Sequence, residues 1–374
     1  MDNCRQTVLC VLVLLIGASA FAQTDRPRKR MIEALTAIDV SAGVEDIEYR
    51  ASLPWMISQV LVYSGVKTNY ADFCAVSGWS AEFHYAHDKV WLAYLSLDKL
   101  PAGRCFIRGI ENYGKRLTLF SWPEVSDEND RLLAARAAWE FIVTNIGAGI
   151  PVLTDYIDGG VLYGYDETLE DPAVYFSTNG PGFGAIHRSK FNEIFLKELH
   201  GLGVIEDDEP GPDPKALLVG VLANLLIRAY EAESDGAPAG IAAMQDLAVD
   251  LLDPTTTWSP QDCWLCFPLS EQTETRLCTA VYLRRNASLL GPAIEPHILA
   301  AADRYEEAFG AWRKRWEASW LTNGAKDDRS CAEMINDTGR REAIAGHVYR
   351  ALGAELLALS EVQKAIDALE APAP

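Results

Sequence analysis

Histidines, cysteine and carboxylates gather in the segment that runs from Cys74 to Asp88. His84 and His87 are three residues apart, which places both on one face of a helix, with Glu82 and Asp88 nearby as oxygen donors. Two histidines without a third ligand are a weak metal signal, so we interpret them as surface or polar-core residues. An alternative is a relocated nucleophile at Cys74 with either histidine, but Cys74 occupies an apolar helix position, where thiols are usually inert.

A second pattern is Cys263-Trp-Leu-Cys266, with the spacing of a redox pair or of half a zinc site. No second pair matches it, and no strand-like run leads into it. We therefore interpret it as a structural disulfide or buried thiols, and we expect no metal and no cofactor. Disulfides are plausible in an oxidising compartment, although their pairing cannot be read from the sequence. Six cysteines follow residue 22: Cys74, Cys105, Cys263, Cys266, Cys278 and Cys331.

The elements before residue 206 are of mixed type. We predict a helix at Pro54–Tyr63 ended by Gly65, and a second at Ser126–Ile146 closed by Gly147. Strand-like runs are expected at Arg104–Ile110 and Arg116–Phe120, joined by a hairpin turn at Asn112-Tyr113-Gly114, and then in quick succession at Pro151–Tyr156, Val161–Tyr165 and Ala173–Ser177. The prediction is an α+β domain in which helices pack on an antiparallel sheet.

An acidic, proline-rich linker at 207–214 separates this domain from the rest. Asp213 and Pro214 suit the N-cap and first position of a helix. After the linker, helical spacing without strand-like alternation predicts an all-α domain over 215–374. Its longest helix carries an aromatic stripe, interpreted as a packed helix face rather than a ligand groove: Phe309, Trp312, Trp316 and Trp320.

The first 22 residues read as a cleavable signal. Arg5, the apolar run Val8–Ile16 and a final Ala-x-Ala pattern predict cleavage between Ala22 and Gln23, so we expect an extracytoplasmic protein, periplasmic or secreted. The basic cluster at 26–30 is interpreted as a solvated mature N-terminus, with a nucleic-acid arm as the alternative. A formal net charge of −20 disfavours nucleic-acid binding, and no later segment resembles a membrane span.

Several segments, in order and spacing, are similar to papain-like bacterial thiol enzymes of the bacteriocin-leader-peptidase group. More narrowly, the chain resembles the butirosin biosynthesis protein H family, which joins such a domain to a helical one. The resemblance covers roughly residues 45–370 and is carried by 52–65, 70–83, 151–155, 161–166, 174–181 and 277–305. It implies a papain-like domain over 23–206, with a Cys nucleophile at a helix start, a His base and an orienting amide or acid.

The matched positions depart from that triad. Ser52 stands where the Cys would be, Asp158 or the following glycines where the His would be, and Asn179 at the orienter position. At the place of an oxyanion glutamine lie Glu45, Asp46 and Ile47. Serine needs an adjacent base, and an exposed carboxylate is a weak one, so we interpret Ser52 as a helix N-cap and Asp158 as a turn residue. His187 has no supporting spacing for catalysis.

The first functional hypothesis is therefore an exported, non-catalytic protein that binds a peptide or small amide-like ligand in the former cleft. The aromatic residues of the matched segments are the predicted binding residues: Trp55, Trp79, Tyr163 and Tyr165. One alternative is an active peptidase, amidohydrolase or acyltransferase that uses Ser52 or Cys74; another is a structural or interaction protein. Export separates the chain from carrier-bound acyl donors in the cytoplasm, which disfavours carrier-dependent acyl transfer.

Overall fold

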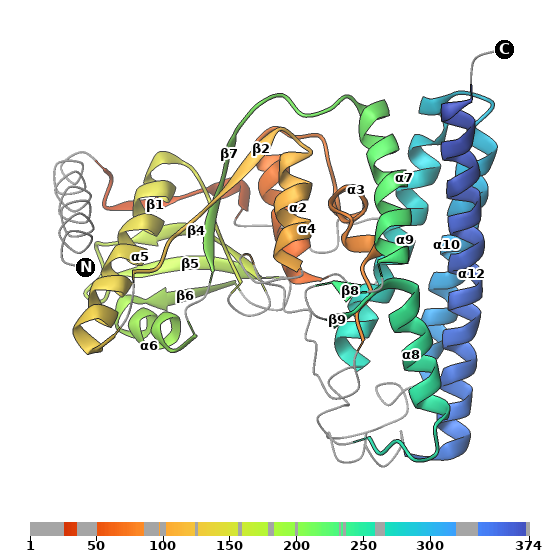
Figure 1. Cartoon of the computed structure of the whole chain (residues 1–374). Coiled ribbons are helices and arrows are strands. Elements are labelled where there is room, and N and C mark those ends of the chain that lie inside the picture. Colours follow the sequence, from red (N-terminus) through yellow and green to blue (C-terminus); the bar gives the residue numbers. More distant parts are fainter. Residues whose placement is uncertain are drawn as a thin grey trace, which may run out of the picture.

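The computed structural model is an α+β molecule in which one antiparallel sheet with its helices lies beside a set of long helices (Figure 1). The structure describes residues 26–35, 51–85, 97, 102–123, 126–155, 159–178, 183–198, 201–231, 233–234, 237–258, 266–318 and 336–371. In these ranges no helix combines the length and apolar character needed to cross a membrane.

The seven-stranded sheet has the order β2-β7-β3-β4-β5-β6, and β1 also pairs with β4. Every neighbouring pair is antiparallel. The strands are β1 (Lys29–Met31), β2 (Lys115–Leu119), β3 (Val152–Thr154), β4 (Gly160–Asp166), β5 (Ala173–Thr178), β6 (Phe183–His187) and β7 (Leu202–Asp207). The predicted strand at 116–120 and the three-strand meander are confirmed. β1 follows β3 along one edge of β4, because β3 pairs with Gly160–Leu162 and β1 with Gly164–Asp166.

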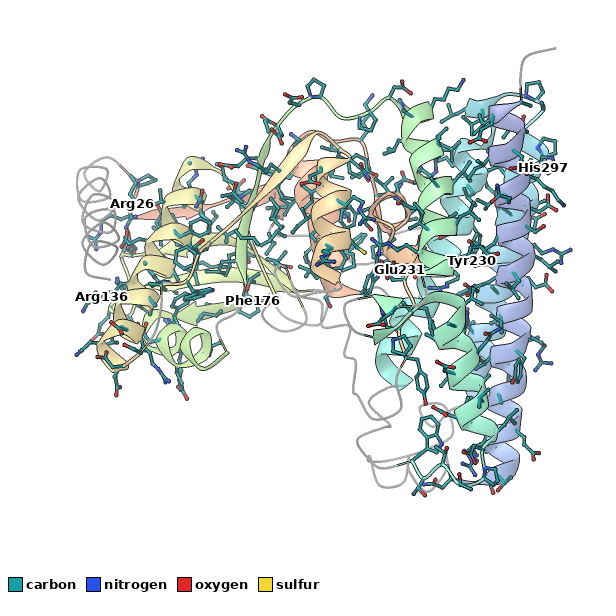
Figure 2. All side chains as sticks on the ribbon, in the orientation of Figure 1. Arg26, Arg136, Phe176, Tyr230, Glu231 and His297 are labelled. Atoms are coloured by element: carbon teal, nitrogen blue, oxygen red, sulfur yellow. The ribbon has the colours of Figure 1, made fainter. Side chains whose placement is uncertain are left out.

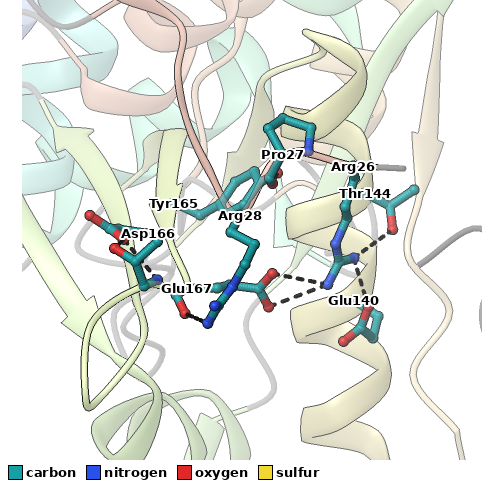
Figure 3. Close-up of polar contacts among 9 residues, drawn as sticks. Arg26, Pro27, Arg28, Glu140, Thr144, Tyr165, Asp166 and Glu167 are labelled. Atoms are coloured by element: carbon teal, nitrogen blue, oxygen red, sulfur yellow. Dashed lines mark hydrogen bonds and ion pairs between the residues drawn. The ribbon is translucent and has the colours of Figure 1, made fainter. Parts of the chain in front are cut away.

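The basic segment at 26–30 is docked at Arg26 while residues 27–29 stay exposed, so the prediction of a solvated N-terminus is only partly confirmed. The Arg26 guanidinium pairs with Glu140 at 2.8 Å and with Glu167 at 3.2 Å (Figure 3). Arg28 donates to the Glu167 carbonyl at 2.7 Å, and the Tyr165 hydroxyl donates to the Pro27 carbonyl. Acidic neighbours partly neutralise Arg26, whereas Arg28 and Lys29 remain exposed.

The helices of the sheet half are α2 (Ser52–Tyr63), α3 (Tyr70–Ser77), α4 (Ala102–Glu111), α5 (Glu128–Ala148) and α6 (Arg188–Glu198), with short 3-10 turns η1 (Glu33–Leu35) and η2 (Trp79–Ala81). The predicted helix at 54–63 is confirmed. α5 ends at Gly149 and not at Gly147, because Gly149 adopts the left-handed conformation (φ 88°) and its N–H caps the last carbonyls.

The predicted strand Arg104–Ile110 is wrong, because this segment forms α4. Cys105, Phe106, Gly109 and Ile110 are its buried residues, a spacing that fits one face of a helix. Gly109 allows α4 to approach α3 closely, since an added Cβ would lie 2.6 Å from that of Ser77. The turn at 112–114 therefore leads from a helix into β2, not from strand to strand.

The second half contains α7 (Pro214–Tyr230), α8 (Gly240–Leu252), α9 (Cys266–Asn286), η5 (Ala287–Leu290), α10 (Glu295–Ala318) and α12 (Thr338–Glu370). Asp213 caps α7 as predicted, accepting from the N–H groups of Lys215 and Ala216 at 2.9 Å each. The helical prediction holds apart from a short hairpin of β8 (Glu233–Ser234) and β9 (Ala237–Pro238).

Two hydrophobic cores fill the molecule, and the chain crosses between them. One lies between the sheet and its helices, and the other between the long helices. Phe83 belongs to the second core although it precedes the linker, and it stacks on Trp312 with ring centroids 5.4 Å apart. Trp312 is fully buried, as expected for a packed stripe, while the side chain of Trp316 and all of Trp320 lie outside the described residues.

Candidate functional site

The start of α2 and the start of β4 are in direct contact. Gly159 precedes β4 with φ of 111°, and a Cβ added to it would lie 2.6 Å from the Cα of Leu53. No side chain fits at 159 without moving the first turn of α2, so this position can hold only glycine in the present backbone. Ser52 is the first residue of that turn.

The sheet brings a third element to this point. Gly160 pairs with Thr154 of β3 on one side and with Thr178 of β5 on the other. The end of β5 therefore lies beside the start of β4. We call the meeting of the α2 start, the β4 start and the β5 end the junction. Asp158 and Asn179 lie outside the described residues, but they are the sequence neighbours of Gly159 and Thr178 respectively.

Ser52 does not cap its helix, so the N-cap interpretation is wrong. The N-cap position falls to Ala51, whose methyl group makes no capping hydrogen bond. The backbone N–H of Ala51 donates instead to the hydroxyl of Tyr70 at 3.1 Å, and this buried contact fixes the entry into α2. The side chain of Ser52 is half-buried. The sequence suggested a cap because serine precedes Leu53-Pro54, yet the helix begins one residue earlier than that pattern implies.

Catalysis by Ser52 needs a neighbouring base. The four histidines of the described ranges are hydrogen-bonded elsewhere. His84 contacts Glu82 at 2.9 Å, His187 the Asp171 carbonyl at 3.1 Å, His297 Glu361 at 2.9 Å and His347 Arg350 at 2.8 Å. His87 is outside those ranges. The structure therefore assigns none of these four to Ser52.

The four predicted binding aromatics are all buried. Trp79 and Tyr165 are 0 % exposed, Trp55 is 2 % exposed and Tyr163 is 5 % exposed, and all four belong to the sheet-side core. Trp55 meets Tyr70 edge to face at 5.9 Å, which connects it to the α2 entry. These side chains are part of the core and do not form an exposed ligand surface.

Three cysteines have described side chains. Cys74, Cys105 and Cys278 are each buried, and none of the three forms a disulfide. Cys74 is fully buried in α3, which leaves its sulfur out of reach of a substrate in solution. Cys263 and Cys331, and the side chain of Cys266, fall outside the described residues, as do Glu45, Asp46 and Ile47.

A polar cluster that sequence reasoning missed surrounds Glu82, where the two halves meet. One carboxylate oxygen contacts His84, and the other accepts from the Cys105 thiol at 3.0 Å and pairs with the Arg228 guanidinium at 3.2 Å. The backbone carbonyl of Glu82 accepts from Arg276 at 2.9 Å. His84 and Glu82 were visible in sequence as neighbours, but Cys105 and Arg228 come from α4 and α7.

The charges of this cluster determine its chemistry. Burial raises the pKa of Glu82, but His84 and Arg228 outweigh it, so the net pKa lies below the usual value of a carboxyl. Burial and the Glu82 charge raise the pKa of the Cys105 thiol well above its usual value. Cys105 is therefore a protonated donor and not a nucleophile. Across the described residues no three His, Cys, Asp or Glu side chains form a group suited to a metal ion.

No protein-family model matches the chain, and no curated protein matches it significantly.

Proposed function

We propose that this chain is an exported protein of papain-like fold that binds a peptide or small amide-like ligand at the junction and performs no catalysis there. The observation that carries the proposal is the contact between the α2 start and Gly159, with the β5 end alongside. The resemblance stated above implies a nucleophile, a base and an orienter at these three backbone positions. The residues Ser52 and Gly159 supply neither a thiol nor an imidazole.

The same junction has groups that suit an amide. The first-turn N–H groups of a helix have no partner within the helix, and they present partial positive charge to a carbonyl oxygen. At α2 the N–H of Ala51 is taken by Tyr70 and Pro54 has none, so Ser52 and Leu53 carry the other N–H groups of this turn. Gly159 packs against the Leu53 backbone, so Ser52 is the donor that we propose for the ligand. The Ser52 hydroxyl adds a further donor and acceptor.

The predicted cleavage site is compatible with the contacts that the N-terminal segment makes in the structure. Cleavage between Ala22 and Gln23 leaves Arg26 and the whole of β1 in the mature chain. The ion pairs of Arg26 and the pairing of β1 with β4 are then available to the exported protein.

The absence of catalysis is tested with activity probes. The mature protein and its Ser52→Ala and Cys74→Ala variants are treated with a fluorophosphonate and with iodoacetamide, and the label is quantified by mass spectrometry. We expect no labelling of Ser52 or Cys74 in the folded protein. Labelling of the native protein that disappears in either variant would show a reactive nucleophile and overturn the non-catalytic proposal.

Binding is tested by titrating a library of acetylated peptide amides while following backbone NMR shifts. We expect shifts for residues of the α2 start and β4 start, and loss of binding in Ser52→Trp, which fills the junction. Ser64→Trp is the matched control, because Ser64 is a half-buried serine at the other end of the same helix. Equal binding by both variants would place the ligand elsewhere.

A further inference from the structure

α12 is the outermost helix of the molecule, and only one of its sides packs against the other helices (Figure 1). Residues such as Ile344, Val348 and Leu359 are buried on that side. The opposite side projects into solvent (Figure 2). We call it the outer face of α12, and it comprises Gly346, Tyr349, Arg350, Gly353, Leu356, Leu357 and Ser360.

Exposed apolar side chains gather on the outer face beside a single arginine, Arg350. Tyr349, Leu356 and Leu357 are 44 %, 38 % and 51 % exposed. They flank a line of small residues that repeats every seven positions, at Gly346, Gly353 and Ser360. Seven residues are nearly two helical turns, so this line follows the helix axis. It is bordered by Tyr349 and Leu356 on one side and by Arg350 and Leu357 on the other.

Packing within the chain does not explain the two glycines of this line. A Cβ added to Gly346 or Gly353 would meet no atom within 4 Å. Glycine in a helix interior is less favourable than alanine. A second helix backbone that approaches this line from outside would gain from the missing side chains.

The charges at the ends of the outer face are arranged symmetrically about Gly353. Glu342 precedes it by eleven residues and Lys364 follows it by eleven. A two-fold axis through Gly353 therefore sets Glu342 opposite Lys364 of a second, antiparallel copy. The same axis sets Tyr349 opposite Leu357, Gly346 opposite Ser360, and Arg350 opposite Leu356, against which the aliphatic stem of the arginine packs. An isologous interface requires this kind of self-complementarity.

The net charge of the chain favours the outer face of α12 over other surfaces as the contact between two copies. The formal net charge is −20, so most surfaces of two copies repel each other. α12 contains four basic and five acidic residues and is thus close to neutral. We propose that the outer face of α12 is a homodimer interface, in which two α12 helices cross antiparallel at Gly353. A single pair of helices buries a small area, so the dimer is weak and forms as protein concentration rises.

Sedimentation velocity of the mature protein over a concentration series tests the proposal, because the symmetry predicts which charges compensate. We expect a monomer–dimer equilibrium that Glu342→Lys or Lys364→Glu alone weakens about tenfold, since each creates two like-charge contacts. The double variant Glu342→Lys/Lys364→Glu restores opposite charges and should regain native affinity. Leu357→Glu should abolish the dimer.

Lys190→Glu is the matched control for total charge. Lys190 is an exposed lysine paired with Glu193 three residues on, as Lys364 is paired with Glu361 three residues back. This control should dimerise like the native chain, and far-UV circular dichroism confirms that all variants are folded. A native protein that stays monomeric at every concentration would overturn the interface. Failure of the double variant to recover would overturn the antiparallel register.

Discussion

At the scale of single residues, Gly159 is the position on which the junction depends most. Its φ of 111° is unfavourable for any other residue, and the added Cβ of an alanine would overlap the first turn of α2. We expect Gly159→Ala to lower the free energy of unfolding by about 3 kcal/mol, from backbone strain and displacement of the helix start. The measurement is the shift of the urea unfolding midpoint.

Gly220→Ala is the control for this substitution. Gly220 lies within α7, and a Cβ there meets no atom within 4 Å, so the change should stabilise the protein by roughly 0.5–1 kcal/mol. A Gly159→Ala variant as stable as the native chain would mean that the contact with α2 does not constrain this glycine, and the geometry of the junction would need revision.

Sequence reasoning at this scale located the backbone of the junction but not the surroundings of its side chains. Ser52 and the glycines after Asp158 could be matched because they follow turn and helix signals along the chain. The burial of Trp55 and Tyr165 depends on which face of an element meets the core, which spacing alone did not decide. The Glu82 cluster was missed because its partners Cys105 and Arg228 are remote in sequence.

At the scale of elements, β1 is held as much by side chains as by its short ladder. Only three residues pair with β4, while Arg26 binds Glu140 and Glu167, and Lys29 pairs with Asp166 at 2.8 Å. The hydrogen bonds from Lys29 and Thr168 lower the pKa of Asp166 to about 2, so this carboxylate stays charged near neutral pH.

Removing the Arg26 guanidinium should therefore loosen β1 without unfolding the chain. We expect Arg26→Ala to cost about 1 kcal/mol locally, because its ion pairs are partly buried. The amide of Ile32, which donates to the Tyr163 carbonyl at 2.8 Å, should then exchange roughly fivefold faster in hydrogen-exchange mass spectrometry. Lys190→Ala, which breaks the exposed ion pair with Glu193, should leave the exchange rate of the Ile32 amide unchanged. Equal rates in both variants would contradict the role given to Arg26.

The prediction of elements succeeded where local signals were strong and failed where tertiary contacts decided. The cap at Asp213 and the strands near 152, 161 and 174 were readable from turn residues and alternation. α4 was mistaken for a strand because the short apolar run Cys105-Phe106-Ile107 is compatible with a buried strand as well as with a helix. Packing of Gly109 against α3 resolves the ambiguity, and that contact is not local.

At the scale of the whole molecule, the linker between β7 and α7 is not what joins the two halves. It arches over the gap as an exposed segment (Figure 1), whereas residues 82–85 enter the helical half directly. Phe83 stacks on Trp312, the His84 backbone bridges to Ala239, and the Tyr85 hydroxyl donates to Asp250 at 2.8 Å. The sequence boundary at 207–214 is therefore not the only connection between the two cores.

These contacts predict that the halves stay together when the linker is cut. With a protease site inserted at Pro210-Gly211, the two cleaved pieces should co-elute in gel filtration. Buried apolar surface and the hydrogen bond from Arg276 to the Glu82 carbonyl join the two halves at an interface that we call the seam.

Phe83→Ala should make the cleaved pieces separate at lower urea, since removing a buried phenyl ring costs about 3–5 kcal/mol. Phe191→Ala, which removes a fully buried ring from the sheet-side core alone, should destabilise that half without promoting separation. Separation of the native pieces upon cutting would mean that the linker, and not the seam, holds the molecule together.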